Sequence, residues 1–201
     1  NGDRIEYFFS GANIGFGKGH NKILEFIKKD SDYHLILNPD VIFEPEILDT
    51  LVFKLYNNNE LSMISPKVLY QNHQLQFTAR KFPTVVELLC RFLGIFKNYT
   101  NRSEYKNQNL EKSFYPDFIQ GSFMLFKTKD LIDLQGFDER YFLYMEDVDL
   151  CKKIKQSGKK ILYEPSVEII HEFGKGSSKN IRLFFIHFFS MIKYFLKWGI
   201  R

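Results

Sequence analysis

The chain has 201 residues, of which 44% are apolar and 26% are charged, so it is long enough for one domain with a packed core and is not intrinsically disordered. Its net charge of +4 is too small to indicate a nucleic-acid-binding protein, although residues 151–201 carry 11 basic and only three acidic side chains. The two cysteines, Cys90 and Cys151, lack the spacing of a metal site, exclude a disulfide scaffold and fit a reducing compartment.

Hydrophobic periodicity and turn residues predict that strands and helices alternate along the chain. The predicted strands cover residues 5–9, 33–37, 63–70, 117–127 and 160–171. The predicted helices lie around residues 23–27, at 45–55 with Pro45 in the first position, at 85–96, in a short stretch that ends at Gly136, and at 146–156, closed by Gly158. Residues 98–109 are polar and predict a loop. This alternation favours an α/β fold with a mixed, mainly parallel sheet flanked by helices.

Polar residues follow several of these predicted strands. They are the Gly-rich loop after residues 5–9, the turn Asn38-Pro39-Asp40 after residues 33–37, and His171 at the end of the last strand. Ligands of open α/β sheets bind where loops leave the carboxyl ends of strands. Asp40 is therefore either a turn residue or a ligand of a hard divalent cation. His171 is either a hydrogen-bonded core residue or a ligand.

Three acidic residues, Glu146, Asp147 and Asp149, open the predicted helix 146–156. Acidic side chains in a first helical turn interact favourably with the helix dipole, and Lys153 and Lys155 follow where a helix favours cations. Three carboxylates in four residues also repel one another, which raises a carboxyl pKa and suits a general base. Both interpretations remain open from the residues alone. The glycines Gly15, Gly17 and Gly19 match no phosphate-binding motif.

Four strings in fixed order carry a resemblance to a known family. They are NIGFGKGHN at 13–21, LILNPDV at 35–41, GSFML at 121–125 and GFDERYFLYMEDVDLC at 136–151. Together they resemble the family 2 glycosyltransferases, and most of all the rhamnosyltransferase-type bacterial enzymes that build polysaccharides. The resemblance covers residues 5–175. It implies the GT-A fold and inverting transfer of a sugar from a nucleotide-diphosphate donor to a saccharide or lipid-linked acceptor. No nucleic-acid partner is expected, because the basic residues near the C-terminus lie along one helical stripe and form no RNA-binding motif.

The resemblance also implies roles for individual residues. Asp147 matches the catalytic base, and Glu146 would bind the acceptor or orient Asp147. Asp40 matches the metal-binding position for Mg²⁺ or Mn²⁺, and His171 matches a metal-binding His of some relatives. The implied donor-binding residues are Asn13, Gly15, Gly19, Asn21, Asn38, Asp40, Gly121 and Ser122.

The match has one departure at its beginning. Family members open with a hydrophobic strand, a turn like Thr-Tyr-Asn, a helix and a second strand, and nothing in residues 1–10 matches this opening. The resemblance therefore predicts that residues 1–178 are a GT-A-like catalytic domain without its usual N-terminal strands. A non-catalytic remnant that binds a partner, an acceptor or a membrane without turnover is the alternative.

Residues 179–201 are predicted to form a separate basic, aromatic, amphipathic helix. Between Ile181 and Trp198, 13 of 18 residues are apolar and five are Phe. At 100° per residue one polar stripe collects Arg182, His187, Ser190, Lys193 and Lys197. These charges disfavour a membrane span and suit a helix in a membrane interface, as for a cytoplasmic protein on the inner face of the cell membrane. Packing on the protein's own body or on a second copy in a homodimer remains the alternative.

Overall fold

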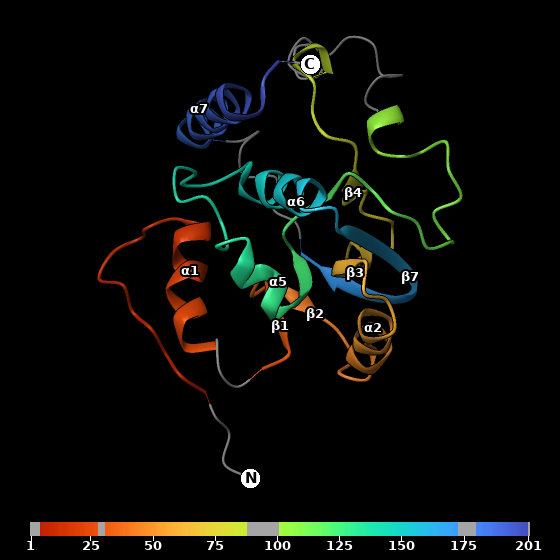
Figure 1. The fold of residues 1–201 in the computed structure, drawn as a ribbon. Coiled ribbons are helices and arrows are strands. Elements are labelled where there is room, and N and C mark those ends of the chain that lie inside the picture. The colour runs from red at the N-terminus through yellow and green to blue at the C-terminus, as the bar shows by residue number, and fades with distance from the viewer. Residues whose placement is uncertain (1–4, 28–30, 88–100, 173–179, 201) are drawn as a thin grey trace.

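The computed structural model describes residues 5–27, 31–87, 101–172 and 180–200 (Figure 1). The helices are α1 (Phe16–Ile27), α2 (Ile47–Tyr56), α5 (Thr128–Asp133), α6 (Glu146–Gln156) and α7 (Ile181–Trp198). The strands are β1 (Tyr33–Leu37), β2 (Val41–Ile42), β3 (Leu61–Leu69), β4 (Ala79–Arg80), β5 (Phe118–Ile119), β6 (Phe123–Lys127) and β7 (Lys160–His171).

Five of these strands form one mixed sheet in the order β1-β6-β3-β7-β2, and β4 and β5 form a separate two-stranded sheet. Strands β1, β3 and β7 run in one direction, while β6 and β2 run in the other. Because β6 lies between β1 and β3, the only parallel pair within the described five-stranded sheet is β3–β7. The α/β class and the mixed sheet are as predicted, but the expectation of a mainly parallel sheet is wrong, because three of the four described strand pairs of this sheet are antiparallel.

Helices cover both faces of the five-stranded sheet. Helix α2 packs Leu51 and Leu55 on one face, and α6 packs Val148 and Ile154 with α1 and α5 on the other. Alternate residues of β6 divide between the two cores, because successive side chains of a strand point to opposite faces. Figure 1 shows this three-layer arrangement, with α2 below the sheet and α6 above it.

Two predicted elements differ from the structure in the first half of the chain. Residues 5–9 form no strand, and Ile5 and Phe9 are 87% and 75% exposed. A β-prone run becomes a strand only beside another strand, and no described strand lies next to this one. Helix α2 begins at Ile47, because Pro45 lies in the preceding turn, where its carbonyl accepts from the Leu48 amide.

The second half also departs from the sequence pattern. The predicted strand 117–127 is divided into β5 and β6 by a turn over 120–122. Of the predicted helix 85–96, residues 85–87 are helical and the remainder lies outside the described residues. The described part of the predicted loop 98–109 begins with helical residues 101–103 and continues as a turn. Its residues Ser103, Glu104 and Tyr105 are buried, so this segment packs against the domain.

Helix α7 forms where it is predicted, with Asn180 accepting hydrogen bonds from the Arg182 and Leu183 amides as its N-cap. It packs on α6 and on the loop before it through polar contacts. The Ser190 hydroxyl donates to the Leu143 carbonyl at 2.9 Å, and the Lys197 ammonium lies 2.7 Å from an Asp149 oxygen. Packing on the protein's own body, one of the two alternatives, is therefore observed. None of the described helices is long and apolar enough to cross a membrane.

Candidate active site

A cavity of about 410 Å³ lies beside the N-terminus of α6. Its walls come from segments far apart in the sequence: the turn after β1, the β4 region, the turn between β5 and β6, the loop into α6, the end of β7 and helix α7. The lining residues used below are Asn38, Gln76, Thr78, Arg80, Gly121, Ser122, Tyr144, Glu146, Asp147, His171 and His187.

The chain enters α6 through two residues in the left-handed backbone region. Tyr144 and Met145 have φ angles of 67° and 70°. This conformation is rare for residues other than glycine and costs about 1–3 kcal/mol for each residue, so it persists where the surroundings enforce it. Because of this backbone conformation, α6 begins directly after Met145. Glu146 and Asp147, in its first turn, both line the cavity.

Backbone amides hold the Asp147 carboxylate. Its Oδ2 accepts from the Gly121 amide at 3.1 Å, and its Oδ1 accepts from the Val148 amide at 2.8 Å. Burial raises the pKa of Asp147, while these hydrogen bonds and the positive charge of Arg80 act in the opposite direction. The turn that splits the predicted strand is thus what brings Gly121 to this carboxylate.

Three buried polar atoms on the cavity wall have no hydrogen-bond partner among the described residues. They are Glu146 Oε2, Ser122 Oγ and Thr78 Oγ1, on side chains that are at most 6% exposed. Burial first, and then the neighbouring charge of Asp147, raise the pKa of Glu146. A buried polar group without a partner costs about 1–3 kcal/mol, so water or a polar ligand in the cavity would stabilise these three groups.

A second polar group surrounds His171 at the end of β7. The His171 Nε2 atom lies 3.3 Å from Asp40 Oδ1 and 3.5 Å from Asn38 Nδ2, and Nδ1 lies 3.1 Å from Gln76 Oε1. The Gln76 amide nitrogen donates to the carbonyl oxygens of His171 and Leu69, so its Oε1 must face the imidazole and accept from Nδ1–H. This makes Nδ1 a hydrogen-bond donor and turns Nε2 toward Asp40 and Asn38.

These residues fit a divalent cation that is shared with a ligand. Burial lowers the pKa of His171, although the negative charge of Asp40 acts in the opposite direction. The lowered pKa favours the neutral imidazole, which is the form that binds metals. One imidazole, one carboxylate and an amide are donors that suit Mn²⁺ or Mg²⁺. No cluster of three or more His, Cys, Asp and Glu side chains exists in the described ranges, so the other ligands would have to be phosphate oxygens or water.

The structure brings together only part of the predicted donor site. Asn38, Gly121 and Ser122 line the cavity with Glu146, Asp147 and His171, and Asp40 adjoins it through His171. Four predicted donor-binding residues, Asn13, Gly15, Gly19 and Asn21, do not line it.

The reasons for that difference are local. Asn13 is exposed and accepts from the Gly15 amide, and Gly15, with φ of 93°, packs against the Phe142 backbone. Asn21 both donates to and accepts from the backbone of Phe137. These contacts tie α1 to the loop before α6, and of the loop between residues 10 and 21 only Phe16 lines the cavity.

Several residues that line the cavity were not predicted from the sequence. Gln76, Thr78 and Arg80 lie around β4, a two-residue strand with no periodic pattern to mark it. His187 comes from α7, and its ring lies 4.8 Å from that of Tyr144. The sequence places His187 on the polar stripe of the predicted helix, and this position is the one sequence feature that could have marked it as a candidate site residue.

Comparison with known proteins identifies the group of proteins to which this site is related. No family model matches the sequence. The chain is 31% identical over 173 residues to the rhamnosyltransferase WbbL of Escherichia coli, an alignment that covers 82% of this chain and 63% of the relative. The chain is similar to rhamnosyltransferases over most of its own length. The resemblance that the four strings carry is thereby confirmed.

Two further relatives agree. The N-acetylglucosaminyl-diphospho-decaprenol L-rhamnosyltransferase of Mycobacterium tuberculosis is 28% identical, with 85% of this chain and 60% of the relative covered. The low-salt glycan biosynthesis hexosyltransferase Agl10 of Haloferax volcanii is 25% identical, with 84% and 52% covered. The chain thus spans about half to six tenths of the length of these curated relatives.

A solved structure supports the fold. The crystal structure of GalNAc-T7 with UDP, GalNAc and Mn²⁺ matches with a TM-score of 0.54 at 13% identity, over 79% of this chain and 30% of that chain. The chain therefore has the GT-A type α/β fold that the resemblance implies.

Proposed function

We propose that this chain carries the site for inverting transfer of a sugar from a nucleotide-diphosphate donor to an acceptor hydroxyl. The proposal rests on one cavity that combines a pair of carboxylates, suited to proton transfer, with a candidate site for a metal ion. The carboxylates Glu146 and Asp147 line it from α6, and the pair His171 and Asp40 adjoins it from β7 and the turn after β1. The name of the mycobacterial relative supports a saccharide acceptor that is linked to a lipid through a diphosphate.

The donor diphosphate is assigned to the His171 side of the cavity. His171 and Asp40 would hold a Mg²⁺ or Mn²⁺ ion there, whose charge would offset the charge that develops on the departing diphosphate. Gln76 keeps the His171 ring in the orientation this requires, and Asn38 lies beside Nε2, with its amide nitrogen 3.5 Å away. Ligand residues with such a fixed tautomer bind more strongly, because the ring needs no rearrangement.

Asp147 is assigned the role of general base. The acceptor oxygen forms a bond to the anomeric carbon from one face, and the bond to the donor phosphate oxygen breaks on the other face with its electron pair. Asp147 takes the acceptor proton, and the raised pKa that burial gives it strengthens it as a base. Glu146, Ser122 and Thr78 offer their unpartnered polar atoms to sugar hydroxyls.

Nucleotide binding tests the donor part of the proposal. Calorimetry with UDP and with dTDP, each with and without Mn²⁺, should show binding of one of them that strengthens with Mn²⁺. Absence of binding by both nucleotides under both conditions would remove the donor site from this chain.

The base assignment has a separate test. Asp147→Asn should reduce sugar transfer about 10²- to 10⁴-fold, the usual contribution of a general base, with little change in thermal stability. Asp133→Asn is the matched control, since Asp133 is exposed at the end of α5 and does not line the cavity. Transfer that survives Asp147→Asn at the level of the control would show that another group takes the proton.

A further inference from the structure

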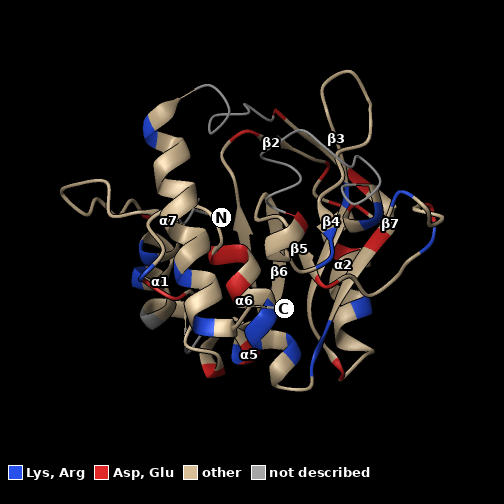
Figure 2. Cartoon of the chain, turned by 90° about the horizontal axis from the view of Figure 1, so that it is seen from above, with Lys and Arg blue, Asp and Glu red and all other residues tan. Residues whose placement is uncertain are grey.

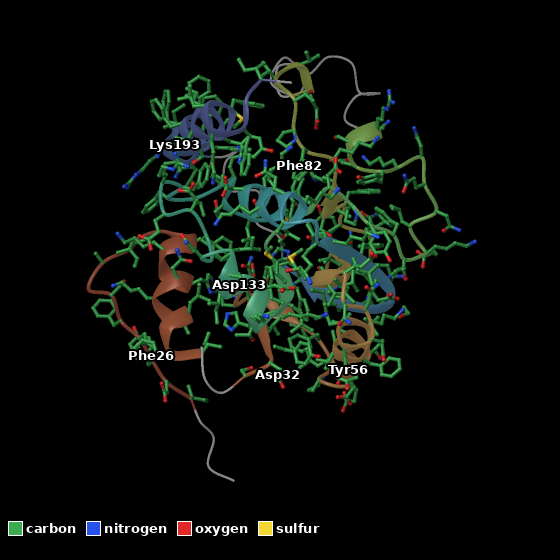
Figure 3. All side chains as sticks on the ribbon, viewed as in Figure 1. Phe26, Asp32, Tyr56, Phe82, Asp133 and Lys193 are labelled. Carbon is green, nitrogen blue, oxygen red and sulfur yellow. The ribbon has the colours of Figure 1, made fainter. Side chains whose placement is uncertain are left out.

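The outer side of α7 carries an apolar strip with no cover in the described structure. Its members are Ile181, Phe185, Phe188, Phe189, Ile192 and Leu196, exposed by 40% to 82%. At 100° per residue these six positions fall within a sector of about 100° on one side of the helix. We call this set the phenylalanine strip. Figure 3 shows carbon-rich side chains of α7 extending away from the rest of the chain.

The opposite side of α7 fixes the direction of the strip. Ser190 and Tyr194 are buried against the body, and Lys197 and Trp198 both donate to Asp149. The predicted polar stripe therefore faces partly inward, the reverse of an isolated amphipathic helix in water. Because these contacts hold the helix in one rotation, the phenylalanine strip cannot turn toward the core.

The positive charge of α7 favours an anionic partner for the phenylalanine strip. Residues 180–200 contain no acidic side chain, and Arg182 and Lys193 are exposed on the same helix. Figure 2 shows the basic bands on α7 without an acidic one. Two copies of this basic face would repel each other, whereas an anionic lipid surface would attract it. A helix with a Phe-rich face and basic flanks that is unable to span a bilayer suits the membrane interface.

The cavity lies on the inner side of the helix that carries the phenylalanine strip. His187 lines the cavity from the inner side of the same helix, beside Tyr144. The strip and the cavity wall are therefore separated by about one helix diameter, on the order of 10–12 Å. A sugar attached to a membrane lipid through a diphosphate stays at the depth of the headgroups, so it can meet the cavity only if the cavity lies at that depth.

We propose that α7 docks the chain on an anionic bilayer through the phenylalanine strip and thereby presents the cavity to a lipid-carried acceptor. The docking surface stands on the geometry of α7, and its use for an acceptor rests on the proposed function. The other occupants of the strip, a second copy or another protein segment, are competing outcomes of the test.

Sedimentation of the 201-residue chain with vesicles tests the docking. Vesicles of phosphatidylcholine mixed with phosphatidylglycerol should bind the chain, and pure phosphatidylcholine vesicles should bind it more weakly. The double variant Phe185→Gln/Phe189→Gln should weaken binding to the mixed vesicles about tenfold or more, because apolar area inserted into the interface drives such binding. The matched control is Phe53→Gln/Tyr56→Gln on α2, whose side chains are 68% and 74% exposed but lie on the other face of the sheet.

Circular dichroism and UDP binding with Mn²⁺, measured on the same variants, keep this test separate from the proposed function. Unchanged spectra with lost vesicle binding support docking, whether or not the nucleotide binds. Failure of the unaltered chain to bind vesicles, or an equal loss in the α2 control, would overturn it. So would size-exclusion data in which the α7 variant turns a dimer into a monomer, since the strip would then be an interface between copies.

Discussion

The three acidic residues that open α6 show what single residues can and cannot reveal. In the sequence they look alike, but Asp149 lies about 160° around the helix from Asp147. Asp147 therefore lines the cavity, while Asp149 is fully buried on the other side and binds α7. Helical spacing could have separated the two, whereas the partner of Asp149 could not be predicted, because Lys197 and Trp198 come from a distant helix.

At the same scale, Gln76 is expected to act through His171. Gln76→Leu removes the acceptor for Nδ1–H and frees the ring to change tautomer, so Mn²⁺-dependent tightening of UDP binding should fall about 10- to 100-fold. Titration calorimetry with Mn²⁺ and UDP measures this effect, and nucleotide binding without metal should change little. Gln74→Leu, an exposed position two residues earlier, is the control. An equal response in both variants would contradict the positioning role.

Two glycines of one segment should respond in opposite directions to the same substitution. Gly15 has φ of 93°, and an added Cβ would overlap the Phe142 carbonyl, which also accepts from the Phe16 amide. Gly15→Ala should therefore lower the free energy of unfolding by about 1–3 kcal/mol. Gly19 lies in α1 with open space at its Cβ, so Gly19→Ala should raise it by up to about 1 kcal/mol. Urea unfolding measures both, and destabilisation by Gly19→Ala would refute this account.

At the scale of elements, periodicity predicts β3, α6, β7 and α7 within three residues of their observed ends, because each has a continuous apolar pattern. Periodicity fails where contacts with distant segments, and not the local pattern, decide whether a segment forms a strand. The β-prone residues 5–9 have no neighbouring strand, and the continuous run 117–127 is broken at 120–122 to bring Gly121 to Asp147. Strand β4 is too short to give any pattern, so the residues it brings to the cavity stay hidden.

The junction of α6 with α7 should be one of the most sensitive contacts between elements. Asp149 is 0% exposed and accepts from Lys197, Trp198 and the Tyr141 hydroxyl. Asp149→Ala leaves these donors without an acceptor and should lower the free energy of unfolding by about 3–5 kcal/mol, as for other broken buried pairs. Chemical denaturation measures the loss. Asp133→Ala should change stability by less than about 0.5 kcal/mol, and a comparable loss there would contradict a specific junction.

At the scale of the whole molecule, the order of the strands could not be read from the sequence. Strand β6 follows β3 by more than 50 residues yet separates it from β1, and that position depends on contacts between distant segments. The motif resemblance nevertheless supplied Asn38, Asp147 and His171, which the structure brings to one cavity. What it could not supply is the wall made by α7, since that helix lies beyond the matched strings.

Acid should release α7 from the rest of the molecule before the sheet unfolds. Hydrogen bonds from Arg140, and then from Lys197 of α7, hold the pKa of Asp138 well below its usual range. A carboxyl whose pKa is depressed by folding stabilises the native state above its unfolded pKa, about 3.9, and loses that contribution as the pH falls below it. Lys193 contacts the Arg140 carbonyl, so the same turn supports α7 at two places.

The single tryptophan makes this release measurable. Trp198 lies at the end of α7 and donates to Asp149 at 2.8 Å, so its fluorescence reports docking of the helix. As the pH falls below about 4, Trp198 emission should shift to longer wavelength at a higher pH than the loss of far-ultraviolet circular dichroism. Asp138→Asn cannot titrate at this position and should make the fluorescence shift less dependent on pH. Coincident transitions of both signals would show that α7 and the sheet unfold as one cooperative unit, since a separately docked helix must lose its contacts first.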